Sequence, residues 1–146
     1  MAATRILLDT GPLVAYFSER DQWHEWAVPR WQSFREPVET CESVLSECVF
    51  LLQSARVSVE PVLEAIESGA ILVRFNLADQ QPDICRLMRK YEDQEMSLAD
   101  ACLVRMAELS EHVQVFTTDE DFAVYRRHGR DLIPLLSPFS HTERQE

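Results

Sequence analysis

The sequence is poor in glycine and lysine, and it lacks the motifs that define several common enzyme classes. Only 3 of its 146 residues are glycine, which disfavours glycine-rich β architectures and loops that wrap around phosphate groups. It contains no Walker A motif, no G-x-G-x-x-G, no G-x-S-x-G and no H-E-x-x-H. Glycine-rich nucleotide loops, serine-hydrolase elbows and zincin-type metal sites are therefore excluded.

Metal-binding cysteine spacings and long apolar runs are also missing. The four cysteines (Cys41, Cys48, Cys85 and Cys102) form no C-x-x-C pair and lie in apolar stretches, so we expect reduced, buried thiols. The N-terminal segment has neither a long apolar core nor a small-residue cleavage site, and no apolar run could span a bilayer. We therefore expect a cytoplasmic protein with no signal peptide and no membrane contact.

Acidic residues outnumber basic residues, 25 against 14, and the formal net charge is −11. This balance argues against tight, nonspecific binding to nucleic acid, which normally requires a basic surface. Two features weaken this argument against nucleic-acid binding. Bound divalent cations would cancel part of the negative charge, and 13 of the basic residues are arginine, which suits bidentate contacts with phosphate.

The length and the alternating apolar pattern predict one α/β domain. Short apolar runs favour five strands, at 4–8, 37–41, 70–75, 113–116 and 132–135. Helical patterns cover 12–18, 22–35, 43–55, 58–67, 80–93, 97–110 and 119–128. Strands that alternate with helices predict a three-layer α/β/α fold with a five-stranded parallel sheet. We assign 1–137 to this domain and expect a polar C-terminal tail at 138–146, frayed from about Ser137 onward.

Four acidic residues fall where such a fold binds ligands, beyond the carboxyl ends of its strands. Asp9 directly follows the first strand, and Asp119 lies just past the strand at 113–116. Glu47 and Asp100 lie near the starts of two predicted helices. Asp100 is the most informative, because its helical neighbours form an inward apolar stripe, where a charge is costly unless it is paired or binds a metal.

Taken singly, these residues also have structural interpretations. Asp9 precedes a Gly-Pro pair and suits a turn, while Asp100 follows Ser97 by three residues, as in a capping motif. Glu47 would complement a helix dipole, and Asp119 could begin a helix. The functional hypothesis needs all four at one edge of the sheet, where such hard oxygen donors suit Mg²⁺ or Mn²⁺. A cation there can activate water and neutralise charge during phosphodiester hydrolysis.

With these residues in place, the sequence resembles PIN-domain proteins, specifically the VapC-type ribonuclease toxins of type II toxin–antitoxin systems. Four ordered segments carry the resemblance: Ile6-Leu-Leu-Asp9-Thr-Gly-Pro-Leu-Val-Ala15, Ser43-Val-Leu-Ser-Glu47, Ser97-Leu-Ala-Asp100-Ala and Val115-Phe-Thr-Thr-Asp119-Glu-Asp-Phe122. The resemblance implies a five-stranded parallel sheet, Mg²⁺- or Mn²⁺-dependent cleavage of RNA, a homodimer, and a cognate antitoxin that blocks the active site.

Carried over residue by residue, the resemblance implies a catalytic and metal-binding acidic quartet: Asp9, Glu47, Asp100 and Asp119. Thr117 matches a hydroxyl residue that should orient Asp119 or a water. Asp121 is a further candidate ligand, because the family's fourth acidic site is the least constant. We add Thr10 to the candidate orienting residues.

Two groups have open interpretations. Arg126 and Arg127 could bind substrate phosphates near Asp119, or lie near the end of a helix, where cations are favoured. Three tryptophans within 23–31 could stack on RNA bases, but their helical spacing favours packing against the core or a partner helix.

The sequence offers two alternatives to a metal-dependent endoribonuclease. The chain could be a PIN-like RNA- or protein-binding module with little or no catalytic turnover, although the intact quartet argues against it. The string Leu7-Leu-Asp9-Thr-Gly11 also resembles an aspartic-protease loop. That chemistry needs a second aspartate from a similar segment, which the sequence lacks.

Overall fold

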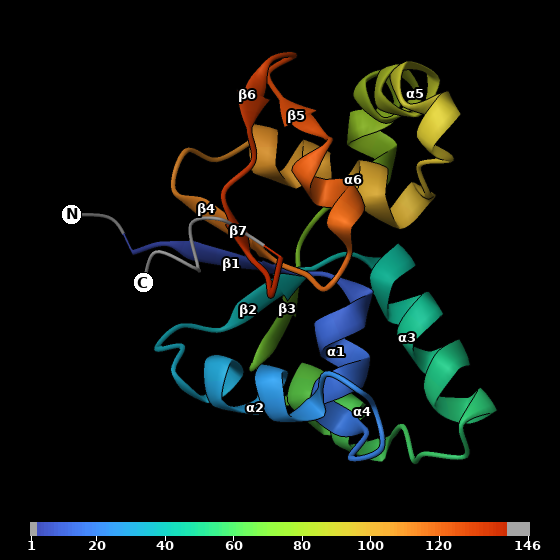
Figure 1. Ribbon diagram of the computed structural model, residues 1–146, viewed down its shortest axis with the longest axis vertical. Coiled ribbons are helices and arrows are strands. Elements are labelled where there is room, and N and C mark those ends of the chain that lie inside the picture. The colour runs from blue at the N-terminus through green and yellow to red at the C-terminus, as the bar shows by residue number, and fades with distance from the viewer. Residues whose placement is uncertain (1–2, 140–146) are drawn as a thin grey trace.

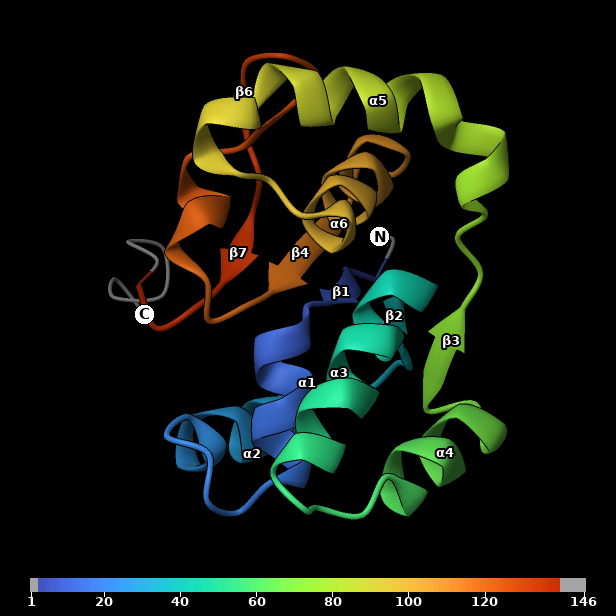
Figure 2. The same ribbon diagram turned by 90° about the vertical axis from the view of Figure 1, so that its right-hand side faces the viewer.

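The computed structural model describes residues 3–139, and the domain has three layers (Figure 1). A five-stranded sheet forms the middle layer. On one side of it lie α1 (Thr10–Phe17) and α2 (His24–Gln32), and on the other lie α5 (Gln81–Lys90) and α6 (Leu98–Glu108). Figure 2 shows α3 (Glu42–Ser54) running beside α1, with α4 (Glu60–Glu67) next to the end of the sheet. The predicted α/β/α architecture is confirmed.

All five strands of the sheet are parallel and follow the order β3-β2-β1-β4-β7. Their bounds are Arg5–Leu8 for β1, Val38–Thr40 for β2, Ile71–Val73 for β3, Val113–Phe116 for β4 and Leu135–Leu136 for β7. From β1 the chain moves outward through β2 to β3 and then returns to place β4 on the other side of β1. The strand order therefore reverses between β1 and β4, the position at which open parallel sheets bind ligands.

Burial explains why these apolar segments form the centre of the fold. Residues 6–8 of β1 are all buried, as expected for a strand that is covered on both faces. The most enclosed helix is α6, which contacts β1, β4, α3 and α5 and buries eight of its 11 residues. Asp100 is one of those eight, so this acidic side chain has little access to water.

Aromatic side chains fasten α2 to the sheet. The rings of Trp26 and Phe34 each lie 5.4 Å from the ring of Phe116 on β4. Trp31 packs at 4.4 Å from Tyr16 of α1. These contacts support the packing interpretation for Trp26 and Trp31.

The C-terminal third differs from the prediction. Residues 119–128 do not form one helix: a short 3-10 helix, η3 (Glu120–Ala123), is followed by an antiparallel hairpin of β5 (Arg126–Arg127) and β6 (Asp131–Leu132). Gly129 lies in the hairpin turn with φ +83°, beside His128 with φ +55°, so it does not end a helix. The fifth strand of the sheet, predicted at 132–135, lies at 135–136, where β7 pairs with β4.

Three smaller expectations can be compared with the structure. All four cysteines are free, as predicted, but Cys85 is exposed rather than buried. Ser137, where we expected fraying to begin, is 1% exposed and accepts a hydrogen bond from the backbone N–H of Phe139 at 3.1 Å. The tail from residue 140 lies outside the described residues. Within 3–139, no helix is long and apolar enough to cross a membrane.

Candidate active site

A cleft of about 740 Å³ lies beyond the carboxyl ends of β1 and β4. All four members of the predicted quartet line it: Asp9, Glu47, Asp100 and Asp119. Thr10 and Asp121 line the same cleft, and Thr117 is wholly buried next to Asp9. The parallel register of β1 and β4 brings these segments together, because the residues that follow the two strands start side by side.

Asp9 caps the N-terminus of α1. One carboxylate oxygen, Oδ1, accepts a hydrogen bond from the Thr10 N–H at 2.8 Å, and Oδ2 accepts one from the Thr117 hydroxyl at 2.6 Å. Burial raises the pKa of Asp9 to about 7; Asp100 and Asp119 add to the shift, and the two hydrogen bonds oppose it. Asp9 is therefore the N-cap of α1 rather than the turn residue considered from the sequence, and a nearby positive charge would stabilise its ionised form.

Thr117 connects Asp9 to the acidic turn after β4. Its hydroxyl donates to Asp9 and accepts from the backbone N–H of Asp119 at 2.9 Å. Asp119 Oδ1 then accepts from the Asp121 N–H at 2.9 Å and so caps η3. The hydroxyl of Thr117 thus orients the carboxylate of Asp9 and the backbone of Asp119.

Asp100 is 9% exposed and lies in the first turn of α6. Its backbone N–H donates to Ser97 Oγ at 3.0 Å, which is the capping contact that the sequence predicted. Its side-chain Oδ2 accepts a hydrogen bond from the Tyr125 hydroxyl at 2.8 Å. Burial raises the pKa of Asp100, the hydrogen bonds from Tyr125 and Ser97 lower it, and the charge of Asp119 raises it.

Glu47 approaches the cleft from α3, where it is exposed. Its Oε2 accepts a hydrogen bond from the Thr10 hydroxyl at 3.2 Å, so Thr10 orients Glu47 in this structure. Gly11 allows α1 to begin this close to the loop after β4. A Cβ atom at Gly11 would lie 2.0 Å from Thr118 Oγ1, so any larger residue would require the Thr118 side chain to move.

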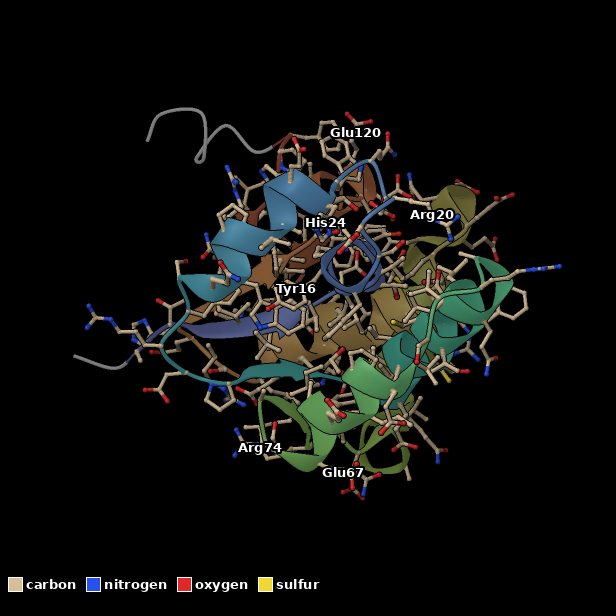
Figure 3. All side chains as sticks on the ribbon, turned by 90° about the horizontal axis from the view of Figure 1, so that it is seen from below. Tyr16, Arg20, His24, Glu67, Arg74 and Glu120 are labelled. Carbon is tan, nitrogen blue, oxygen red and sulfur yellow. The ribbon has the colours of Figure 1, made fainter. Side chains whose placement is uncertain are left out.

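The described lining of the cleft carries eight carboxylates and no lysine, arginine or histidine. The eight are Asp9, Asp21, Glu47, Glu95, Asp100, Asp119, Glu120 and Asp121. Figure 3 shows Glu120, one of the eight, on the opposite side of the molecule from Arg74. Because the described lining holds no basic side chain, neutralisation of this cleft must come from a bound proton, a cation or another molecule.

Arg126 and Arg127 do not line the cleft in this structure. Arg126 Nη1 donates to the backbone carbonyls of Ala123 and Val124 at 2.8 and 2.9 Å, at the end of η3. Arg127 Nη1 donates to the Ala107 carbonyl at 3.3 Å, near the end of α6. Both arginines thus contact carbonyls near the ends of η3 and α6, whereas the helix predicted at 119–128, whose end they were expected to occupy, does not form.

The donors around the cleft suit a hard divalent cation. Carboxylates and hydroxyls surround Asp9 and Asp100, with no thiol or imidazole in the described lining, and such oxygen ligands are those that Mg²⁺ and Mn²⁺ prefer. Within residues 3–139, no three His, Cys, Asp or Glu side chains already form a metal-binding cluster.

Two residues at this site were not identified as functional from the sequence. Tyr125 was assigned to a helix and given no role, and Gly11 was treated only as part of a turn. For Tyr125, the available signal was weak: a tyrosine near an acidic turn, whose hydroxyl would need a partner if buried. For Gly11, the steric need appears only once Thr118 lies against it.

The sequence and the fold match a known class of proteins. The family model described as the PIN domain matches residues 6–127, so the chain belongs to the PIN-domain family. Its structure is similar to that of VapC20 from Mycobacterium tuberculosis, described as a toxin that cleaves the sarcin–ricin loop. The two share 25% sequence identity with a TM-score of 0.72, over 82% of this chain and 93% of that chain. No curated protein matches the sequence.

Proposed function

We propose that this protein is a Mg²⁺- or Mn²⁺-dependent endoribonuclease that acts in the cytoplasm as the toxin of a toxin–antitoxin pair. One observation carries the proposal: Asp9 and Asp100 are buried in a cleft at the switch point of a PIN-domain sheet, and no basic residue of the described lining neutralises them. Similarity to a toxin that cleaves the sarcin–ricin loop supports RNA as the substrate.

In this proposal Asp9 and Asp100 are the principal metal ligands. Glu47 completes the set from α3, and Asp119 and Asp121, joined by one hydrogen bond, offer carboxylates from the turn after β4. A divalent cation bound here would supply the positive charge that activates water and offsets negative charge on the phosphate during cleavage. The chain's own hydroxyl groups, from Thr10 and Thr117, keep the carboxylates in place.

The acidic lining makes cation binding a condition for RNA binding as well as for cleavage. Eight carboxylates repel the phosphate backbone, and the arginines at 126–127 are bound to backbone carbonyls. RNA should therefore bind weakly in EDTA and more tightly when Mg²⁺ is added. Gel-shift titration of the parent protein with and without Mg²⁺ tests this, with a denaturing gel of the same samples to show that the probe remains intact. The Asp9→Asn variant does not serve here, because it removes a proposed metal ligand.

The same cleft suits a basic partner. A cognate antitoxin with lysine or arginine in its toxin-binding segment would complement the eight carboxylates and block the site. The family resemblance adds a homodimer to the proposal. A short DNA-binding protein encoded directly upstream should form a complex on co-expression and suppress cleavage. Harmless overexpression of this chain, from a gene with no such neighbour, would contradict the toxin assignment.

The direct test is cleavage of a labelled, structured RNA by the purified full-length chain. We expect cleavage with Mg²⁺ or Mn²⁺, none with EDTA, and none for Asp9→Asn or Asp100→Asn. The matched control is Asp79→Asn, which removes an exposed carboxylate outside the cleft and should cleave like the parent. Equal cleavage by all four proteins would assign the activity to a contaminant or another site. Mn²⁺ binding without cleavage of any RNA would favour the binding-module alternative.

A further inference from the structure

The fold brings a buried tyrosine hydroxyl against the carboxylate of Asp100. Tyr125 is 0% exposed, and its hydroxyl donates to Asp100 Oδ2 at 2.8 Å across 25 residues of sequence. A buried hydroxyl needs a partner, but a backbone carbonyl would satisfy it without placing a carboxylate in the interior. The choice of Asp100 as acceptor therefore calls for a reason beyond the packing of Tyr125.

The ring of Tyr125 is held firmly from several sides. Tyr91 and Phe122 pack edge-on against it, with ring centroids at 5.0 and 5.2 Å. Its backbone N–H donates to the Asp121 carbonyl at 3.1 Å. The next residue, Arg126, donates its backbone N–H to the Tyr91 hydroxyl at 2.8 Å. The hydroxyl of Tyr125 thus has little freedom to move away from Asp100.

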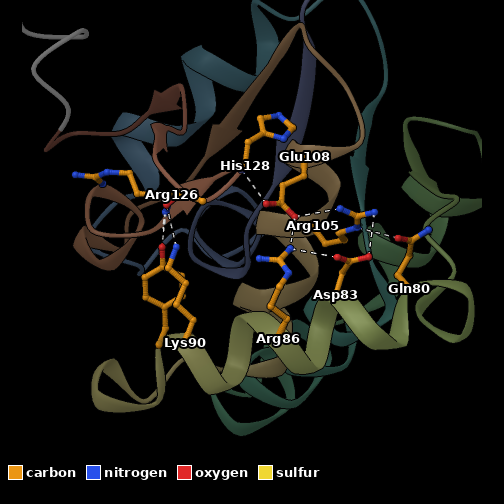
Figure 4. Close-up of polar contacts among 10 residues, drawn as sticks. Gln80, Asp83, Arg86, Lys90, Arg105, Glu108, Arg126 and His128 are labelled. Carbon is orange, nitrogen blue, oxygen red and sulfur yellow. Dashed lines mark hydrogen bonds and ion pairs between the residues drawn. The ribbon is translucent and has the colours of Figure 1, made fainter.

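The hairpin that follows Tyr125 is tied to the same helix that carries Asp100 (Figure 4). Glu108 of α6 accepts a hydrogen bond from the His128 N–H at 2.8 Å, and it also pairs with Arg105 at 3.1 Å. Lys90 of α5 donates to the Gly129 carbonyl at 3.0 Å. The Glu108–His128 bond at the end of α6 and the Asp100–Tyr125 bond in its first turn thus join the segment at 125–129 to both ends of α6, and Lys90 joins the segment to α5.

We propose that Tyr125 is a positioning residue for the metal site: its hydroxyl holds the Asp100 carboxylate in one orientation, in which the carboxylate can bind a divalent cation. This inference rests on the proposed function of the cleft. An ionised carboxylate accepts several hydrogen bonds, so the bonds from Tyr125 and Ser97 do not exhaust it. Loss of a hydrogen bond that orients a metal ligand typically lowers metal affinity or activity about 10- to 100-fold.

The test compares two tyrosine variants of the full-length chain by calorimetric titration with Mn²⁺ alone. Tyr125→Phe removes the hydroxyl that reaches Asp100 and keeps the ring that packs against Tyr91 and Phe122. Tyr91→Phe removes the hydroxyl that accepts from the Arg126 N–H, so it loosens the same segment but leaves the Tyr125 hydroxyl on Asp100. We expect Mn²⁺ affinity to fall about 10- to 100-fold for Tyr125→Phe and clearly less for Tyr91→Phe. A purely structural role would change both affinities alike and would overturn the inference.

A double-mutant cycle with Asp100→Asn separates this inference from the proposed function. If Asp100→Asn weakens Mn²⁺ binding, Tyr125→Phe should cause little further loss in that background, because both act through one carboxylate. An equal loss in both backgrounds would overturn the positioning role while leaving the metal site intact. If Asp100→Asn binds Mn²⁺ like the parent, the proposed metal site itself fails. The Mn²⁺-induced rise in unfolding temperature gives the same comparisons for any variant of reduced stability.

Discussion

Asp9 and Glu39 are equally buried, at 5% exposure each, and they lie on or directly after neighbouring strands of one sheet. Glu39 accepts two hydrogen bonds from Arg5 at 2.6 Å and one from Arg74 at 3.1 Å. These arginines hold the pKa of Glu39 below its usual value, although burial acts the other way. Asp9 has only neutral donors, from Thr10 and Thr117, and burial raises its pKa to about 7.

The difference separates a carboxylate that serves the fold from one that we assign to the proposed metal site. The chain contains the positive charges that stabilise Glu39, so this residue is complete in the folded monomer. Asp9 exposes as little of its surface as Glu39 but has no such partner, and its neighbours Asp100 and Asp119 raise its pKa further. A buried carboxylate with no positively charged partner is the one whose ionised form a bound cation stabilises most.

The largest expected difference between the two carboxylates is in RNA cleavage. Asp9→Asn should lower the cleavage rate by about 100-fold or more, since even partners that merely orient a metal ligand contribute about 10- to 100-fold. Glu39→Gln should remain within about threefold of the parent, because its charge is neutralised away from the cleft. Initial rates on one labelled RNA at saturating Mn²⁺ measure both. Comparable losses for the two variants would erase the distinction between them.

In the absence of metal, the two substitutions should change stability in opposite directions. Asn keeps the N-cap acceptor of Asp9 but carries no charge, so Asp9→Asn should raise the free energy of unfolding at neutral pH. A pKa raised from 3.8 to about 7 sets an upper bound of roughly 4 kcal/mol on that gain. Glu39→Gln should lower the free energy by about 1–3 kcal/mol, because hydrogen bonds to a charged group are lost. Urea unfolding in EDTA measures the change in the free energy of unfolding for each variant and so gives both signs.

The pH dependence of stability should also have opposite signs at the two residues. The folded pKa of Asp9 is raised, so Asp9 does not reduce the free energy of unfolding of the parent below about pH 4, where it is protonated in both states. This free energy then falls as the pH rises toward about 7. Because the folded pKa of Glu39 is lowered, its contribution is present above its unfolded pKa and is lost as pH falls through the folded value. The advantage of Asp9→Asn over the parent should therefore grow between about pH 4 and 7, while the deficit of Glu39→Gln should shrink at acid pH. Parallel unfolding curves for all three proteins would contradict both assignments.

The smallest expected effect is stabilisation by the metal itself. Free Mn²⁺ at ten times its Kd should add about 1.4 kcal/mol to the parent and to Glu39→Gln, since only the folded state binds. Asp9→Asn should gain little. Thermal unfolding with and without Mn²⁺ measures the change, and an equal gain in Asp9→Asn would move the binding site away from the cleft.

The sequence allowed most of the fold and the acidic quartet to be predicted, because both depend on strong local patterns. The run before Asp9 is apolar on both faces, as a central parallel strand requires, and Asp100 interrupts an otherwise apolar helical stripe. Convergence of the quartet followed from the rule that ligands bind where strand order reverses. Register between β1 and β4 is a long-range property, and only the structure shows it.

The segment after Asp119 could not be predicted correctly for an identifiable reason. Two adjacent residues, His128 and Gly129, both adopt positive φ, and the pair lacks the Asn-Gly or Asp-Gly signature of a hairpin turn. Gly129 therefore resembled the end of a helix. This error concealed Tyr125, whose contact with Asp100 depends on the true course of the chain through η3 and β5.

The central claim is that the cleft at Asp9 and Asp100 holds a divalent cation, and anomalous scattering from crystals grown with Mn²⁺ tests it most directly. The account predicts an anomalous peak in the cleft within bonding distance of Asp9 and Asp100, and its loss in crystals of Asp100→Asn. An empty cleft at a Mn²⁺ concentration that supports cleavage, or a peak at another place in the molecule, would contradict it.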